Sequence, residues 1–300
     1  MKPINLKTKL LAFAVASFGM ISTEAAAQNL PRCTSTSSSA SGTSPVNGTP
    51  SCLFTPKSTE LKIYSLAICE EAPAIGSNEG CAVLFSDPAG RTVTINGTSS
   101  NLTLSDDISI AEGTYKYGVI HISNEIGFNA SFSFTSNRSA KNITNNGLNG
   151  NGTVCYTNGT KTSEIPDSGQ SIVMNNTTCG DSDLSRTSVH RGAGALLFPA
   201  PYNKLTGTSS EGSFSAHFLD ADNNPATINF QGQYGHPNNS TNAKSIWALQ
   251  TFYVAPTVSP NTTNIDLSIL MTDAMRMRFD GDGSIGGMNL WQFGVKVSVN

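Results

Sequence analysis

Two acidic segments hold the residues whose type and spacing could bind a metal ion. One is Asp-Gly-Asp-Gly near the end of the chain, where Asp280 and Asp282 alternate with glycines. The other, LDADNNPA, carries Asp220 and Asp222. Calcium takes about six to eight oxygen ligands, and these carboxylates could supply part of such a shell. The full calcium-loop pattern is missing, because no Glu follows either segment. Asp-Gly is also a favoured hairpin dipeptide, so we expect turns here and keep Ca²⁺ as the alternative.

Side chains for catalysis form no recognisable motif. A glycosidase needs two nearby carboxylates, and Asp106, Asp107, Glu112, Asp220 or Asp273 could provide them, but the sequence does not place them. The chain contains no Gly-x-Ser-x-Gly nucleophile elbow and no Gly-x-x-x-x-Gly-Lys phosphate loop. We therefore name no catalytic residue and do not expect an enzyme.

Aromatic side chains are the other candidates for ligand contact. Trp247, Tyr253 and Trp291 would stack on a sugar ring if they were exposed together on one face beside paired acids. The simpler interpretation of most aromatic residues in this chain is that they belong to the core.

Six cysteines are present, and all of them lie at or before residue 179. Near neighbours have the smallest cost of loop closure. We therefore predict the disulfides Cys33–Cys52, Cys69–Cys81 and Cys155–Cys179. No C-x-x-C pair occurs, which makes a zinc site a weak alternative.

The N-terminus has the pattern of a secretory signal peptide. Three lysines precede the apolar run 10–21, and small residues lead up to Ala27. The run is shorter than the roughly 20 residues that span a bilayer, so we expect cleavage after Ala27 and no membrane span in the mature chain. The expected location is secreted, periplasmic or at the cell surface.

Charge excludes one class of partner. The whole chain has a net charge of −3, and removal of the signal peptide takes away three lysines and Glu24, which leaves −5. Nucleic-acid binding needs clustered Lys and Arg, so nucleic acid is not an expected partner.

The remaining sequence has the pattern of an all-β protein with little or no helix. Short apolar runs alternate with Gly, Asn, Asp and Pro, which is typical of an antiparallel β-sandwich or jelly roll. The expected strands are 60–69, 81–86, 91–96, 114–123, 128–135, 152–157, 170–176, 212–219, 226–231, 245–255, 263–279 and 289–299. Residues 87–90 should form the turn of one hairpin, and residues 124–127 should contain the bend of another.

Composition suggests a division into segments. We expect a Ser/Thr-rich flexible segment at 28–57, a disulfide-bearing β-domain at 58–182 and a cysteine-free β-domain at 195–300. The alternative is one large sandwich over 58–300.

The last two expected strands, 263–279 and 289–299, should form a hairpin around the Asp-Gly-Asp-Gly segment, because both alternate apolar and polar residues. Asp273 interrupts this pattern, since it occupies the apolar parity. A lone buried carboxylate is costly, so we expect a bulge at 272–274 or a partner for Asp273. A short helix over 267–275 is a further alternative.

These patterns favour an exported, non-catalytic β-sandwich protein that serves as a cell-surface, adhesion or extracellular-assembly component. Its partners would be other copies of itself or surface glycans. If the protein assembles, the C-terminal strand is the expected donor or edge. The simpler interpretation, which we favour, is that this strand only completes its own domain. The alternative is a secreted carbohydrate-binding protein or carbohydrate-active enzyme.

Overall fold

The computed structural model describes residues 30–40, 50–102, 110–141, 147–163, 176–191, 204–229 and 240–300. All regular structure in these ranges is β, which confirms the expected all-β, sandwich-type fold. The same ranges contain no helix that is long and apolar enough to cross a membrane. The signal peptide expected at 1–27 lies outside the described residues, as does all but the last residue of the strand expected at 170–176.

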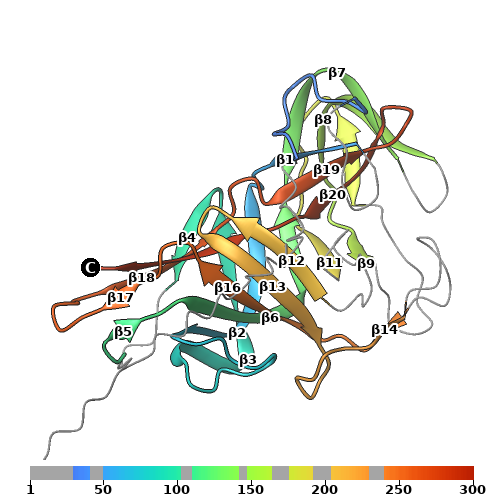
Figure 1. Cartoon of the computed structure of the whole chain (residues 1–300). Coiled ribbons are helices and arrows are strands. Elements are labelled where there is room, and N and C mark those ends of the chain that lie inside the picture. Colours follow the sequence, from blue (N-terminus) through green and yellow to red (C-terminus); the bar gives the residue numbers. More distant parts are fainter. Residues whose placement is uncertain are drawn as a thin grey trace, which may run out of the picture.

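Three sheets contain most of the described strands (Figure 1). In spatial order, the six-stranded sheet consists of β1 (Ser51–Phe54), β19 (Met275–Phe279), β20 (Ile285–Leu290), β7 (Ser131–Lys141), β8 (Leu148–Thr157) and β10 (Thr177–Gly180). The eight-stranded sheet consists of β12 (Lys204–Ser209), β13 (Gly212–Leu219), β16 (Ser245–Phe252), β6 (Tyr117–Asn129), β11 (Ser188–Arg191) and β9 (Lys161–Ser163), with β2 (Ser58–Cys69) on β6 and β3 (Ala82–Asn96) on β2. The three-stranded sheet consists of β21 (Gly294–Val299), β18 (Ile265–Leu270) and β4 (Ser99–Leu102). Two short pairs complete the set, β14 (Ile228–Asn229) with β15 (Ser240–Thr241) and β17 (Thr257–Val258) with β5 (Gly113–Thr114).

One hydrophobic core is shared by the three sheets. Alternate side chains of a strand face the same side, and in β2 this places Leu61 and Ile63 inside. The six-stranded sheet contributes Met277 and Phe279 to the same cluster, and the three-stranded sheet contributes Ile269. All five side chains are almost completely buried, so the sheets stabilise one another by apolar burial.

Strands from both halves of the chain pair with each other. β6 and β16 form an antiparallel ladder in which His121 lies opposite Trp247. In the six-stranded sheet β20 lies beside β7, with Ile285 opposite Ala140. The segments 58–182 and 195–300 therefore share hydrogen-bonded strands, and their division into two domains or one large sandwich stays a prediction.

The two internal hairpins predicted from turn-forming residues are wrong. Residues 87–90 lie within the single strand β3, where the register with β2 shifts between Ser86 and Arg91, so the extra residues form a bulge. Residues 124–127 continue β6, because β2 and β11 pair with this part of the strand on its two sides. The chain then passes into the six-stranded sheet at β7.

The C-terminal hairpin forms, but both of its arms bend and change sheets. Residues 275–279 and 285–290 pair in the six-stranded sheet as β19 and β20, and β18 pairs with β21 in the three-stranded sheet.

The break between β18 and β19 falls at the expected position. Asp273 there has a φ of 56° and forms an ion pair with Arg32, in which Nε and Oδ2 are 2.6 Å apart. The backbone is thus distorted at Asp273, and the Asp273 carboxylate has a charged partner, so both expected solutions occur together. No helix forms over 267–275.

Three disulfides stabilise the fold, namely Cys33–Cys52, Cys69–Cys81 and Cys155–Cys179. These are the near-neighbour pairs that loop closure favours, and they indicate an oxidising environment. The first disulfide holds residues 31–33 against β1, where the backbone N–H of Cys33 donates to the carbonyl of Leu53. Part of the segment 28–57, expected to be flexible, is therefore a paired strand.

Candidate functional site

The Asp-Gly-Asp-Gly segment forms the turn between β19 and β20. The backbone N–H of Asp280 donates to Ser284 O, and that of Gly283 donates to Asp280 O, at 2.9 Å each. The Asp282 carboxylate accepts hydrogen bonds from the hydroxyl and the backbone N–H of Ser284, and these bonds lower its pKa. Lys141 Nζ lies 3.7 Å from Asp280 and 4.0 Å from Asp282. Both carboxylates considered as metal ligands are thus within ion-pair distance of the same lysine.

The second acidic segment is also a turn, at the end of β13. Asp220 Oδ1 accepts hydrogen bonds of 2.9 Å from the backbone N–H groups of Asp222 and Asn224. Asn223 between them has a φ of 62°, a left-handed conformation that Asn tolerates. The two acidic turns follow strands of different sheets, β13 in the eight-stranded sheet and β19 in the six-stranded sheet. Over the described ranges, no group of three or more His, Cys, Asp or Glu side chains is placed to hold a metal ion. Calcium binding at either turn stays a prediction.

The carboxylates considered for glycoside hydrolysis occupy separate elements. Asp106 and Asp107 lie outside the described residues, and Glu112 is exposed before β5. Asp220 follows β13, whereas Asp273 is paired with Arg32 between β18 and β19.

The three aromatic residues proposed to stack on a sugar do not share an exposed face. Trp247 is only 2% exposed and Trp291 is 7% exposed, whereas Tyr253 is 63% exposed. Trp247 belongs to a small buried cluster of the eight-stranded sheet that also contains Cys69 and Val119. Trp291 instead lines an apolar cavity of about 60 Å³, between the inner face of that sheet and residues 290–295. The cavity has room for only a few water-sized molecules.

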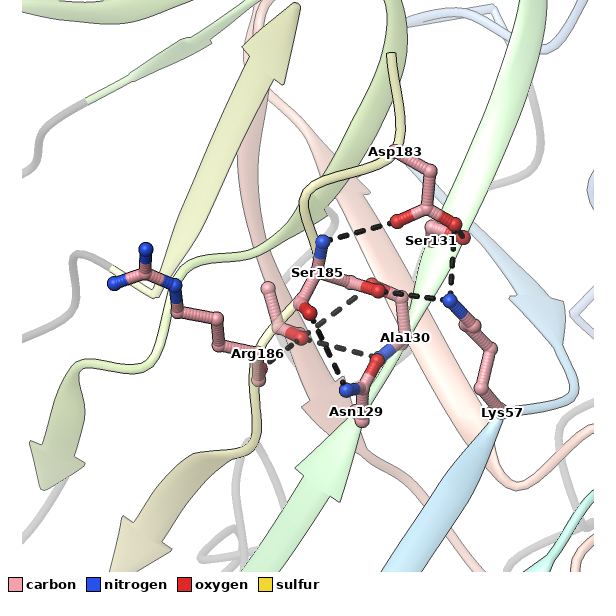
Figure 2. Close-up of polar contacts among 8 residues, drawn as sticks. Lys57, Asn129, Ala130, Ser131, Asp183, Ser185 and Arg186 are labelled. Atoms are coloured by element: carbon pink, nitrogen blue, oxygen red, sulfur yellow. Dashed lines mark hydrogen bonds and ion pairs between the residues drawn. The ribbon is translucent and has the colours of Figure 1, made fainter.

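A polar cluster joins the end of β6 to the segment before β11 (Figure 2). The carboxylate of Asp183 accepts hydrogen bonds from Ser131 Oγ at 2.6 Å, from Lys57 Nζ at 3.0 Å and from the backbone N–H of Ser185 at 3.0 Å. Partial burial opposes ionisation, but the hydrogen bonds from Ser131, Ser185 and Lys57 outweigh it and hold the pKa of Asp183 well below its ordinary value. The buried hydroxyl of Thr157 accepts a hydrogen bond from the backbone N–H of Ala130 and donates one to Arg186 O.

This cluster resembles a Ser–Lys pair, because Lys57 Nζ lies 2.9 Å from Ser185 Oγ. A lysine activates a serine only when the amine has lost its proton. Here the Lys57 amine also forms an ion pair with Asp183, in which Nζ and Oδ2 are 3.0 Å apart. The contacts of Lys57 with Asp183 and Ser185 hold the segment 183–186 against the sheet. The sequence offers no signal for these contacts, because Lys57 and Asp183 are 126 residues apart.

β21 lies at the edge of the three-stranded sheet. β21 pairs with β18 on one side and with no described strand on the other. Figure 1 shows the C-terminal end of the chain projecting from the left of the molecule. The side chains of Val297 and Val299 pack partly against the core, whereas Lys296 is exposed.

The hydrogen-bond pattern shows which backbone groups of β21 face outward. Asn300 exchanges both backbone bonds with Asn264 of the segment before β18. Hydrogen-bonded and non-hydrogen-bonded pairs alternate in an antiparallel ladder. Lys296 and Ser298 therefore bond to β18, and the N–H and C=O groups of the odd-numbered residues point away from it.

Gln250 occupies the first part of this edge. Its side-chain amide donates to Val295 O at 2.6 Å, and its amide oxygen accepts from Val295 N–H at 2.9 Å. The carboxamide thus makes the two bonds that a neighbouring strand would make. The backbone groups of Val297 and Val299 have no partner among the described residues.

No family model matches the chain, and no curated protein and no solved structure shows a significant similarity to it.

Proposed function

We propose that this chain is an exported, non-catalytic β-sandwich protein that serves as a cell-surface, adhesion or extracellular-assembly component. One observation carries the proposal: no strand in the described part of the chain pairs with β21 at Val297 and Val299, so its antiparallel edge is open there. An unpaired edge can accept a strand from another chain, and its main-chain hydrogen bonds then supply affinity.

The surroundings of the edge support the same function. Asn300 is fixed to Asn264 through the backbone and to Asp266 through its side chain at 3.0 Å, so the last residues of β21 are held in an extended conformation. A strand that is already ordered loses less conformational entropy when it binds. The three disulfides fit a protein that works in an oxidising compartment outside the cytoplasm.

A proline at the open edge tests the proposal. Val297→Pro removes an N–H that points away from β18, so the monomer should fold while strand addition is blocked. Val297→Thr is the matched control, because it keeps the N–H and the β-branched shape. We expect size-exclusion chromatography with light scattering to show concentration-dependent assembly of the oxidised chain 28–300 and of Val297→Thr, and a monomer for Val297→Pro.

Two results would contradict the proposal. One is a wild-type chain that remains a monomer at every concentration. The other is a Val297→Pro chain that folds and assembles as well as the wild type, since the edge would then have no part in association.

A further inference from the structure

We infer that the strand which β21 accepts is β21 of a second copy, paired antiparallel around a two-fold axis that passes between the two Ser298 residues. This inference rests on the proposed function, because it names the partner at the same edge. It follows from two observations. The backbone groups of Val297 and Val299 are open, and the side chain of Gln250 already bonds the backbone of Val295.

The register is restricted by Gln250. Only Val297 and Val299 have open backbone groups on β21, since the carboxamide of Gln250 already bonds both groups of Val295. Placing Val297 opposite Val297 of the second copy would bring Val299 opposite the blocked Val295. Placing Val299 opposite Val299 would leave Val297 opposite no described residue, so only one described open residue of each edge would be paired. The register that uses both open residues places Val297 opposite Val299, twice.

Each of these two hydrogen-bonded pairs exchanges two N–H···O=C bonds. The same register places Ser298 opposite Ser298 as a non-hydrogen-bonded pair, with Cα atoms about 4.5 Å apart. It also places Lys296 opposite Asn300, so the like charges of the two lysines are not adjacent. The edge is therefore complementary to itself in hydrogen bonding, and this register keeps the two lysines apart.

A cysteine at the two-fold axis tests this register directly. A disulfide needs Cα atoms about 4.4–6.8 Å apart, which the two Ser298 positions satisfy. The two Lys296 positions are offset by four residues, more than about 13 Å at the rise of a strand. We expect Ser298→Cys to give a covalent dimer on a non-reducing gel after mild oxidation, at least about tenfold faster than the matched control Lys296→Cys. Adding Val297→Pro to Ser298→Cys should abolish the cross-link.

Four results would overturn the inference. Equal cross-linking of Ser298→Cys and Lys296→Cys would show random collision, and cross-linking that survives Val297→Pro would show contact without strand pairing. If Ser298→Cys fails to cross-link while the wild type assembles in a Val297-dependent way, the register is wrong and the proposed function stands. If the wild type is also monomeric, both fail.

Discussion

The imidazole of His190 lies inside the sandwich, where its Nδ1 is 2.8 Å from Thr162 Oγ1 and its ring borders the apolar cavity. Burial lowers its pKa to about 4 from the ordinary value of 6.5. In the unfolded chain this group takes up a proton as pH falls through about 6.5, whereas in the folded chain it stays neutral until about pH 4. Folding stability should therefore decrease between these two values as pH falls.

We expect this loss to be on the order of 2 kcal/mol at pH 5 relative to pH 7. His190→Gln can still hydrogen-bond to Thr162 but has no charge to gain, so its stability should fall less over the same interval. Urea unfolding followed by tryptophan fluorescence at both pH values measures the difference. Carboxyl groups titrate alike in the two proteins, so parallel stability curves for the wild type and His190→Gln would contradict the role assigned to this side chain.

At the scale of elements, the bend between β18 and β19 depends on the conformation of Asp273. A φ of 56° is unfavourable for most L-residues but not for glycine. The ion pair with Arg32 should add little, because the Arg32 side chain is 72% exposed. We expect Asp273→Ala to be less stable than Asp273→Gly by about 1 kcal/mol. Thermal unfolding of the two variants measures this, and an Ala variant as stable as the Gly variant would contradict it.

The turn between β19 and β20 gives a second test at this scale. Asp282→Ala removes the acceptor of two hydrogen bonds from Ser284, so we expect a loss of about 0.5–1.5 kcal/mol in the free energy of unfolding. If the segment is only a turn, the loss should be the same in calcium and in EDTA. Wild-type stabilisation by calcium that disappears in Asp282→Ala would instead identify a metal site.

Some elements could be predicted from the sequence because the evidence for them is local. The cysteine pairs follow from spacing, and the break at Asp273 follows from a carboxylate at an apolar parity. Residues 87–90 were ambiguous, because Pro and Gly suit a bulge as well as a hairpin turn, and pairing with β2 decided between them. The bonds from Gln250 to Val295 and from Lys57 to Asp183 could not be predicted, since they depend on strand order.

At the scale of the whole molecule, the sheets combine strands from distant parts of the chain. β6 lies between β2 and β16, and its removal from either neighbour would expose apolar side chains such as Ile120 and Ile122. We therefore expect the oxidised chain to unfold in one cooperative transition and the fragment 58–182 not to fold alone. Calorimetry of the chain and circular dichroism of the fragment measure this. A fragment with cooperative unfolding would support two domains instead.

Hydrogen exchange at single amides measures whether the edge of β21 is open and whether a second strand covers it. The amides of Lys296 and Ser298 bond to β18 and should be protected at any protein concentration. Those of Val297 and Val299 should exchange quickly in dilute protein and become protected as concentration rises, because a second strand covers them. Fast exchange of Val297 and Val299 at every concentration would contradict assembly at this edge. Protection of both amides in dilute monomer would show that the edge is not open.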